Sequence, residues 1–192
     1  MNKLLKNNNK TKQKNINLIS QIKKYLKRLY IKYYMHKHVI IERELANIRL
    51  HDAYNNLPKS LQNILEKNEF EIYIVKTIDG NENIAGQIMY NIKLILLKNM
   101  FFEFEKNFYH ECGHALDNKS KNKFISKSGE FRSIYLNEKD NFKAENNLEY
   151  YISSPTEYFA SAFAEYMLNP ERLRENTPRT YEFIDLQVEQ TG

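Results

Sequence analysis

Alternation of hydrophobic and other residues predicts three strands in the first half of the chain. The first strand is expected at Phe70, Ile72, Ile74 and Ile78, before the turn signal Asp79-Gly80. Two further apolar segments, 84–90 and 92–97, predict a second and a third strand, separated near Asn91.

A hydrophobic pattern of helical period replaces this alternation after residue 100. It predicts one helix over about 100–116 and a second that begins at Ser154-Pro155-Thr156-Glu157. Thr177-Pro178 indicates the start of a final helix. The mostly polar residues 117–149 predict a long loop with a lid-like role. Strands followed by helices indicate an α+β fold with a small mixed or antiparallel sheet and a helical C-terminal part.

Charge divides the chain more sharply than its net value of +5 suggests. Residues 1–38 hold eleven of the 29 Lys and Arg and none of the 24 Asp and Glu, so they carry +11 and the other residues carry −6. The first 15 residues predict a disordered tail, and apolar positions from Ile16 onward predict a basic amphipathic helix. We therefore expect a basic tail and helix over residues 1–50 and a folded domain over 51–192.

The basic residues 1–38 have two interpretations. Lysines interleaved with tyrosines suit an anionic surface, such as a membrane or a nucleic acid. Alternatively, the apolar stripe packs against the rest of the chain and the lysines are solvated.

Composition excludes several classes of protein. Cys112 is the single cysteine, so neither an intramolecular disulfide framework nor a multi-cysteine zinc module is expected. No apolar run approaches the roughly 18 residues of a membrane helix, so no transmembrane segment is expected. A basic start without an apolar h-region does not match an ordinary secretory signal, which favours a cytoplasmic location.

Residues 110–114 form an HExxH pattern within the expected helix 100–116. Because successive residues of an α-helix are about 100° apart, His114 lies about 40° from His110, and the two imidazoles can hold one Zn²⁺. Glu111 lies about 60° from His114, close enough to act as general base on a zinc-activated water without ligating the metal. Cys112 points away and is expected to be a packed apolar residue, and Gly113 can allow a neighbouring segment to approach.

A catalytic zinc site needs a third protein ligand from outside this pattern. No histidine follows His114, so a carboxylate is expected, and Glu157 in the first turn of the next apolar helix is the leading candidate. The same residue completes a capping box with Ser154, so the spacing leaves the roles of ligand and cap equally open. Glu149 and Glu165 are the competing carboxylates, although Glu165 lies two turns further along the same helix.

Three segments of the chain are distinctive as a set. They are Tyr109-His-Glu-Cys-Gly-His-Ala-Leu-Asp117, Glu157-Tyr-Phe-Ala-Ser-Ala-Phe-Ala-Glu-Tyr166 and Pro178-Arg-Thr-Tyr-Glu-Phe-Ile184. Together they resemble the catalytic domain of anthrax toxin lethal factor and the related secreted Pro-Pro endopeptidases of Gram-positive bacteria. The resemblance extends from about Leu57 to about Val188. It implies a zincin-like metallopeptidase domain with an HExxH active-site helix.

The resemblance also implies roles for individual residues. In the family, the glutamate that opens the Phe-Ala-rich helix is the third zinc ligand, which implies Glu157 here. A tyrosine seven residues earlier faces the substrate oxygen, which implies Tyr150, with Tyr151 as the alternative. Such enzymes bind an extended peptide along an edge strand, which implies 92–97 or 84–90. The resemblance leaves open a preference for Pro-Pro bonds and secretion or delivery by a non-standard route.

The sequence therefore predicts a zinc metalloendopeptidase of the gluzincin type, with one Zn²⁺ per chain held by His110, His114 and Glu157. Glu111 is the expected general base and Tyr150 the expected oxyanion donor. Two alternatives stay open: a cytoplasmic regulatory metallopeptidase that cleaves a repressor-type partner, and a non-catalytic module that binds membrane or nucleic acid through the basic N-terminal region. The sequence does not indicate an oligomeric state.

Overall fold

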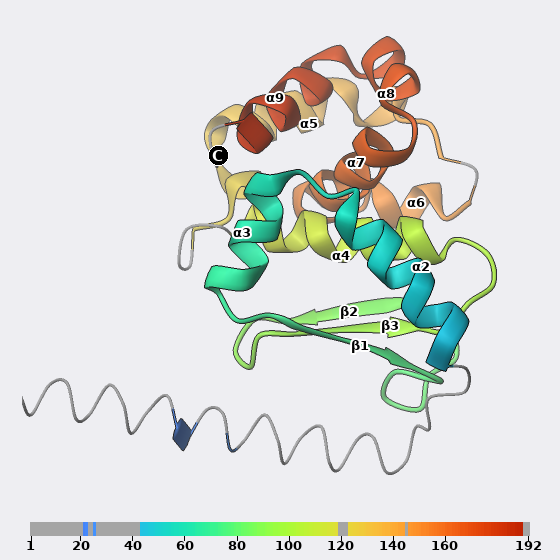
Figure 1. Cartoon of the computed structure of the whole chain (residues 1–192). Coiled ribbons are helices and arrows are strands. Elements are labelled where there is room, and N and C mark those ends of the chain that lie inside the picture. Colours follow the sequence, from blue (N-terminus) through green and yellow to red (C-terminus); the bar gives the residue numbers. More distant parts are fainter. Residues whose placement is uncertain (1–20, 23–24, 26–42, 119–122, 145, 190–192) are drawn as a thin grey trace, which may run out of the picture.

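The computed structural model of the chain describes residues 21, 22, 25, 43–118, 123–144 and 146–189. The elements in chain order are α2 (Arg43–Asn55), α3 (Lys59–Lys67), β1 (Glu71–Val75), β2 (Gly86–Met89), β3 (Leu94–Lys98), α4 (Phe104–Asp117), η1 (Ile125–Lys127), α5 (Gly129–Glu138), η2 (Lys139–Asn141), α6 (Leu148–Tyr151), α7 (Pro155–Leu168), α8 (Pro170–Asn176) and α9 (Pro178–Glu189). Helix α4 is central: the sheet lies on one side of it and α7 packs on the other (Figure 1). Helices α5, α8 and α9 form a further layer beyond α7. None of the described helices is long and apolar enough to cross a membrane.

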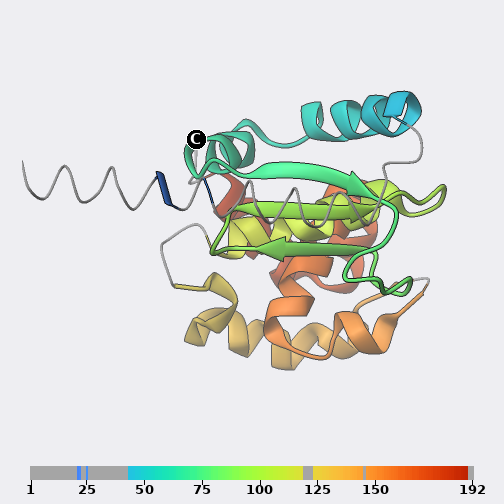
Figure 2. The same ribbon diagram turned by 90° about the horizontal axis from the view of Figure 1, so that it is seen from below.

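The sheet is small and mixed, with the strand order β1-β3-β2. Strand β3 pairs in parallel with β1 and antiparallel with β2, where Gly86 lies opposite Leu97. Figure 2 shows β1 on the side of α2 and α3, and β2 on the side of α6 and α7. The predicted α+β fold with a small mixed sheet is confirmed. Of the two candidate edge strands, the expectation for 92–97 is wrong, because β3 is paired on both sides.

Arg49 of α2 bonds this helix to the start of α4 and to the residues just before it. Arg49 donates from Nε and Nη2 to the two carboxylate oxygens of Glu105, at 2.7 and 2.6 Å. Its Nη1 donates to the carbonyl oxygens of Met100 and Phe101. The expected boundary between tail and folded domain, at residue 50, falls inside α2. Of the expected tail and amphipathic helix before α2, only residues 21, 22 and 25 are among the described residues.

The expectation of a long loop over residues 117–149 is wrong for most of its described part. Helix α5 begins after Ser128, whose Oγ accepts a hydrogen bond from the backbone N–H of Phe131. Phe131, Ile134 and Tyr135 are spaced along one helical face and are buried. At the end of α5, the buried Glu138 carboxylate accepts hydrogen bonds from the backbone N–H groups of Arg179 and Thr180, and thereby caps α9.

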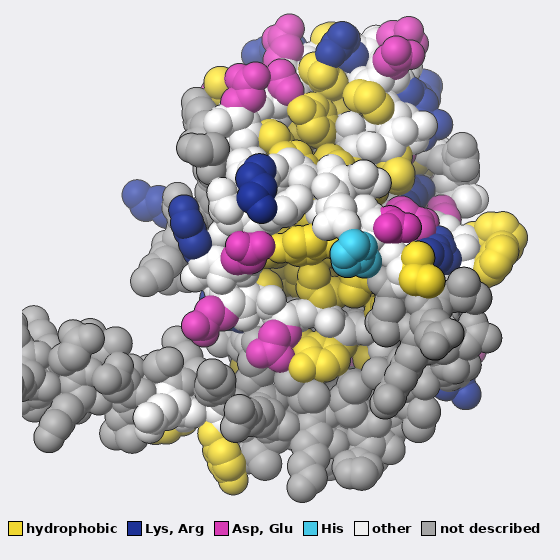
Figure 3. Space-filling model, viewed as in Figure 1, with side chains coloured by type: hydrophobic (Ala, Val, Ile, Leu, Met, Phe, Trp, Pro, Cys, Tyr) yellow, Lys and Arg dark blue, Asp and Glu magenta, His cyan; other side chains and the backbone are white. Residues whose placement is uncertain are grey.

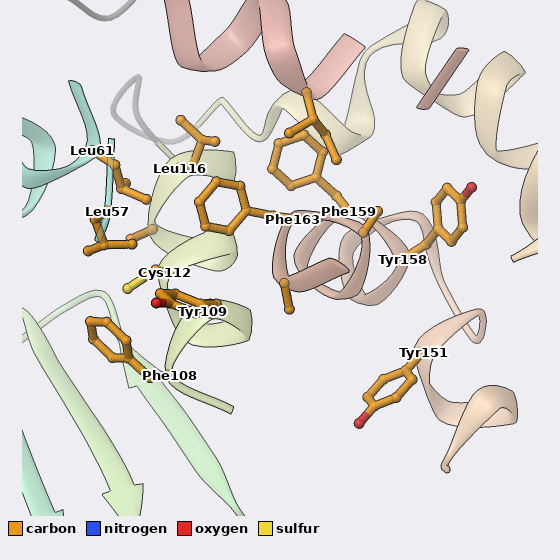
Figure 4. Packing of buried hydrophobic residues seen from close by; sticks show 14 of the residues in the cluster. Leu57, Leu61, Phe108, Tyr109, Cys112, Leu116, Tyr151, Tyr158, Phe159 and Phe163 are labelled. Carbon is orange, nitrogen blue, oxygen red and sulfur yellow. The ribbon is translucent and has the colours of Figure 1, made fainter. Parts of the chain in front are cut away.

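The hydrophobic core is built around α4 (Figure 4). Cys112 is buried on the side of α4 that faces Leu57, away from α7, as expected for a packed apolar residue. Phe163 of α7 points toward the other side of α4, and Phe159 packs against Phe131 of α5.

The contact between α4 and α7 depends on the absence of a side chain at Gly113. A Cβ atom at this position would lie 2.8 Å from the Cα and 2.9 Å from the carbonyl oxygen of Ala160. Both are backbone atoms of α7, so they cannot move without shifting the helix. The expected close approach at Gly113 is confirmed, and it explains a glycine inside a helix, where it costs about 1 kcal/mol relative to alanine.

We expect Gly113→Ala to lower the free energy of unfolding by about 1–3 kcal/mol, because the clash with α7 outweighs the higher helix propensity of alanine. Urea-induced unfolding measures this change. Gly129→Ala in α5 is the control, since nothing lies within 4 Å of its added Cβ. A Gly113→Ala protein as stable as the wild type would contradict this account of the interface.

Candidate metal centre

Three side chains from two helices converge where α4 meets α7. His110 and His114 lie on one face of α4, and their rings are 4.7 Å apart in an edge-to-face arrangement. Glu157 in the first turn of α7 places Oε2 3.3 Å from Nε2 of His110 and 3.5 Å from Nε2 of His114. One potential ligand atom from each residue lies within 4.8 Å of the other two. The structure thus brings together the three residues expected to hold zinc.

Glu157 forms only half of the capping box that its spacing allows. Its backbone N–H donates to Oγ of Ser154, which is the N-cap of α7. Its carboxylate turns to the histidines instead, where Oε2 is buried and has no partner with hydrogen-bond geometry among the described residues. Although burial opposes it, contact with His110 and His114 holds the pKa of Glu157 well below its ordinary value. A buried anionic oxygen that faces two imidazole nitrogens suits a divalent cation.

Ser161 orients the first histidine. Its Oγ lies 3.2 Å from Nδ1 of His110, and both residues are buried. A hydrogen bond to one ring nitrogen selects the tautomer and directs the other nitrogen, here Nε2, toward Glu157. Ser161 is four residues after Glu157, so both project from the same side of α7. The sequence analysis did not assign it a role, although this spacing could have indicated it.

Glu111 lies beside the cluster, on the side of the sheet. It is 5% exposed, and burial raises its pKa to about 7. Its carboxylate is packed against Gly86 of β2. A glutamate with a pKa near neutrality is suited to accept and return a proton.

The structure separates the two neighbouring tyrosines by exposure. Tyr150 is 54% exposed, and partial burial together with its contact with Glu157 raises the pKa of its hydroxyl. Tyr151 is buried, and Nζ of Lys106 lies 4.9 Å from the centre of its ring. Tyr150 is therefore the tyrosine whose hydroxyl is placed at the cluster and is open to a ligand.

Asp117 ties the end of α4 to the start of α7. Its two carboxylate oxygens accept hydrogen bonds from the backbone N–H and the Oγ of Ser126, at 2.6 and 2.7 Å. Ser126 Oγ also lies 3.2 Å from Oγ1 of Thr156, the residue before Glu157. On the sheet side, the Tyr90 hydroxyl donates to the carbonyl oxygen of His114. These bonds anchor the turns that carry the cluster.

The competing carboxylates are placed elsewhere. Glu165 is buried and accepts hydrogen bonds from Nε and Nη2 of Arg172, and it also bonds Asn169. These contacts connect α7 to α8. Glu149 is exposed in α6 and does not belong to the metal-ligand cluster of the described residues.

Comparison with known proteins identifies the family of the chain. A family model described as anthrax toxin lethal factor, N- and C-terminal domain, matches residues 1–187. The chain belongs to the anthrax toxin lethal factor family. It is 38% identical over 78 residues to a Pro-Pro endopeptidase of Clostridioides difficile (strain 630), a stretch that covers 39% of this chain and 34% of that protein. The alignment therefore spans about a third of that relative.

A solved structure shows the same fold. The Pro-Pro endopeptidase from Paenibacillus alvei superimposes with a TM-score of 0.62, over 77% of this chain and 93% of that chain. The two sequences are 19% identical, so this likeness concerns the fold. The family match and the structural likeness together confirm the zincin-like fold.

We expect Ser161→Ala to weaken zinc binding about 10–100-fold, because His110 loses the partner that orients its ring. Competition with a chromogenic zinc chelator measures the change. Ser133→Ala, at an exposed position of α5, is the matched control and should bind zinc as the wild type does. Unchanged zinc affinity in Ser161→Ala would show that the hydrogen bond does not support the site.

Proposed function

We propose that this chain is a zinc-dependent metalloendopeptidase that hydrolyses peptide bonds. The observation that carries the proposal is the placement of His110, His114 and Glu157 within ligand distance of one another, beside the buried carboxylate of Glu111. Membership of the lethal factor family supports it, and the relatives from C. difficile and P. alvei are named Pro-Pro endopeptidases.

The residues present fit a zinc ion. Two imidazoles and one carboxylate form a common ligand set for catalytic zinc, and a fourth position stays open. The buried Oε2 of Glu157, which lacks a well-directed hydrogen bond, is the atom that a cation would satisfy. Zinc in such a site polarises a carbonyl group and lowers the pKa of a coordinated water to about 7.

Glu111 is the proposed general base. Its carboxylate accepts the proton of the attacking water as the new C–O bond forms at the peptide carbonyl carbon. The same carboxyl group then delivers that proton to the departing amide nitrogen as the C–N bond breaks. A pKa near 7 suits both transfers, and burial beside the cluster supplies it.

Tyr150 is the proposed oxyanion donor. Its hydroxyl lies at Glu157 while its ring reaches the surface, with a ring centroid 6.3 Å from that of His110. A hydroxyl held at this position can donate a hydrogen bond to the carbonyl oxygen as negative charge develops on it. Its raised pKa keeps the hydroxyl protonated and able to donate.

The proposed substrate is an extended peptide that pairs with the free edge of β2. The backbone N–H of Lys98 donates to the carbonyl of Ala85, so the odd-numbered residues of this segment face β3. The backbone groups of Gly86 and Ile88 then point outward and can pair with a substrate strand. Gly86 is also the residue in contact with Glu111, which sets the bound peptide beside the base.

We take Pro-Pro bonds as the first candidates for cleavage, since the relatives named above carry this specificity in their names. On the face drawn in Figure 3, acidic and basic side chains are interspersed over the described surface. This face is the side of α2 and α3, and it does not show the edge of β2.

We expect Glu111→Gln to keep one zinc ion per chain and to lose peptide cleavage by at least about 10²-fold, because glutamine cannot accept the proton. Metal content by mass spectrometry and turnover of a fluorogenic peptide library containing Pro-Pro bonds measure the two effects. Glu130→Gln, at an exposed position in α5, is the control and should cleave normally. Cleavage by Glu111→Gln at the wild-type rate would disprove the assignment of the base.

Replacing the two tyrosines one at a time tests the oxyanion donor. Tyr150→Phe should lower kcat about 10²–10³-fold with a small change in KM, because its hydroxyl acts in the transition state. Tyr151→Phe should stay within a few fold of the wild type, since the ring that packs beside Lys106 is retained. A larger loss of kcat in Tyr151→Phe than in Tyr150→Phe would reverse the assignment.

A further inference from the structure

We infer that Gly86 is a positioning residue for Glu111: the missing side chain on β2 leaves the space that the carboxylate occupies. This inference rests on the proposed function, in which Glu111 is the general base. A Cβ atom at Gly86 would lie 2.6 Å from Oε1, 2.9 Å from Cγ and 3.1 Å from Cδ of Glu111. The first two distances are shorter than any normal contact of a Cβ atom, so the carboxylate and a side chain at position 86 exclude each other.

The backbone conformation does not explain a glycine at this position. Gly80 is the one glycine of the described residues with a positive φ, of 72°. Gly86 lies in a regular strand and pairs with Leu97 in an antiparallel register, a conformation open to any L-residue. Glycine also weakens a strand, and it often marks a position where another group approaches closely. Here that neighbour is the side chain of Glu111.

The backbones of the two partners are held in place, so the end of the Glu111 side chain is the part that can move. Strand β2 is held on one side by β3, and Tyr90, the residue that follows it, bonds the carbonyl oxygen of His114 in α4. On the other side, Glu111 belongs to a helix that packs closely on α7 at Gly113. A side chain at position 86 would therefore displace the Glu111 carboxylate and leave the helices in place.

The displacement should separate catalysis from metal binding. The atoms within 3.1 Å of the added Cβ all belong to Glu111, so the histidines and Glu157 keep their positions. The backbone N–H and C=O of residue 86, which face the substrate edge, are also retained in alanine. We expect Gly86→Ala to bind one zinc ion per chain, to show a KM within about threefold of the wild type, and to lose kcat at least about 10-fold, as a misplaced base does.

A thermal unfolding cycle tests the contact without any substrate. The wild type, Gly86→Ala, Glu111→Ala and the double variant are compared at one excess concentration of zinc, so that metal binding adds equally to each Tm. Gly86→Ala should lower Tm by about 2–8 °C in the wild-type background. In the Glu111→Ala background the loss should shrink to below about 1 °C, because the space beside residue 86 is then empty.

Gly129→Ala is the matched control, since the space around its Cβ is open; it should keep the wild-type kcat and should not lower Tm. The inference is overturned if Gly86→Ala keeps the wild-type kcat, or if it lowers Tm equally in both backgrounds. A coupled Tm loss in a chain that cleaves no peptide would support the contact and contradict the proposed function. The two ideas can therefore fail separately.

Discussion

The close packing of α4 on α7 is the contact on which the site depends. Gly113 brings the two helix backbones together at Ala160, and no larger residue would permit that distance. Once the helices are this close, residues three positions to either side can meet across the contact. His110 of α4 and Glu157 of α7 each lie three residues before the crossing point, and His114 directly follows Gly113. The geometry of the candidate metal centre is therefore a property of helix packing.

Burial then determines what these polar groups can do. Removal of water raises the pKa of Glu111 and acts against the ionised form of Glu157, which the two histidines nevertheless keep charged. The two neighbouring glutamates therefore differ in pKa. Glu111 can exchange a proton near neutral pH, whereas Glu157 stays ionised and can hold a cation. Hydrogen bonds from Ser161 and Ser126 limit the movement of the surrounding side chains. Buried and hydrogen-bonded side chains of this kind are what electrostatic catalysis needs.

Local signals in the sequence predicted much of this structure. The helical period and the Ser154-Pro155 start identified α4 and α7, and the 100° step of the helix placed His110 and His114 on one face. Glu157 was ambiguous because its spacing fits both a capping box and a metal ligand. In the structure its backbone N–H bonds Ser154, and its carboxylate turns to the histidines. A capping box would turn the carboxylate back to the N-cap, and the histidines of α4, which are distant in sequence, draw it away.

Features that depend on distant pairing were not predictable in the same way. The pattern of residues 84–97 does not reveal which strand is the edge, because that depends on where β1 pairs. Helix α5 was hidden by its polar surroundings, although Phe131, Ile134 and Tyr135 are spaced for it. Gly86 carries a local signal, a glycine in a strand, but the residue that needs the space lies 25 positions later in the chain.

X-ray absorption at the zinc edge of the purified chain tests the central claim most directly, because it reports the atoms bound to the metal. The account predicts one zinc ion per chain, surrounded by imidazole nitrogen and oxygen at about 2.0–2.2 Å. Imidazole scattering should be lost together with the metal in His110→Ala. A chain that binds no zinc, or a sulfur neighbour at about 2.3 Å, would contradict a site made of His110, His114 and Glu157.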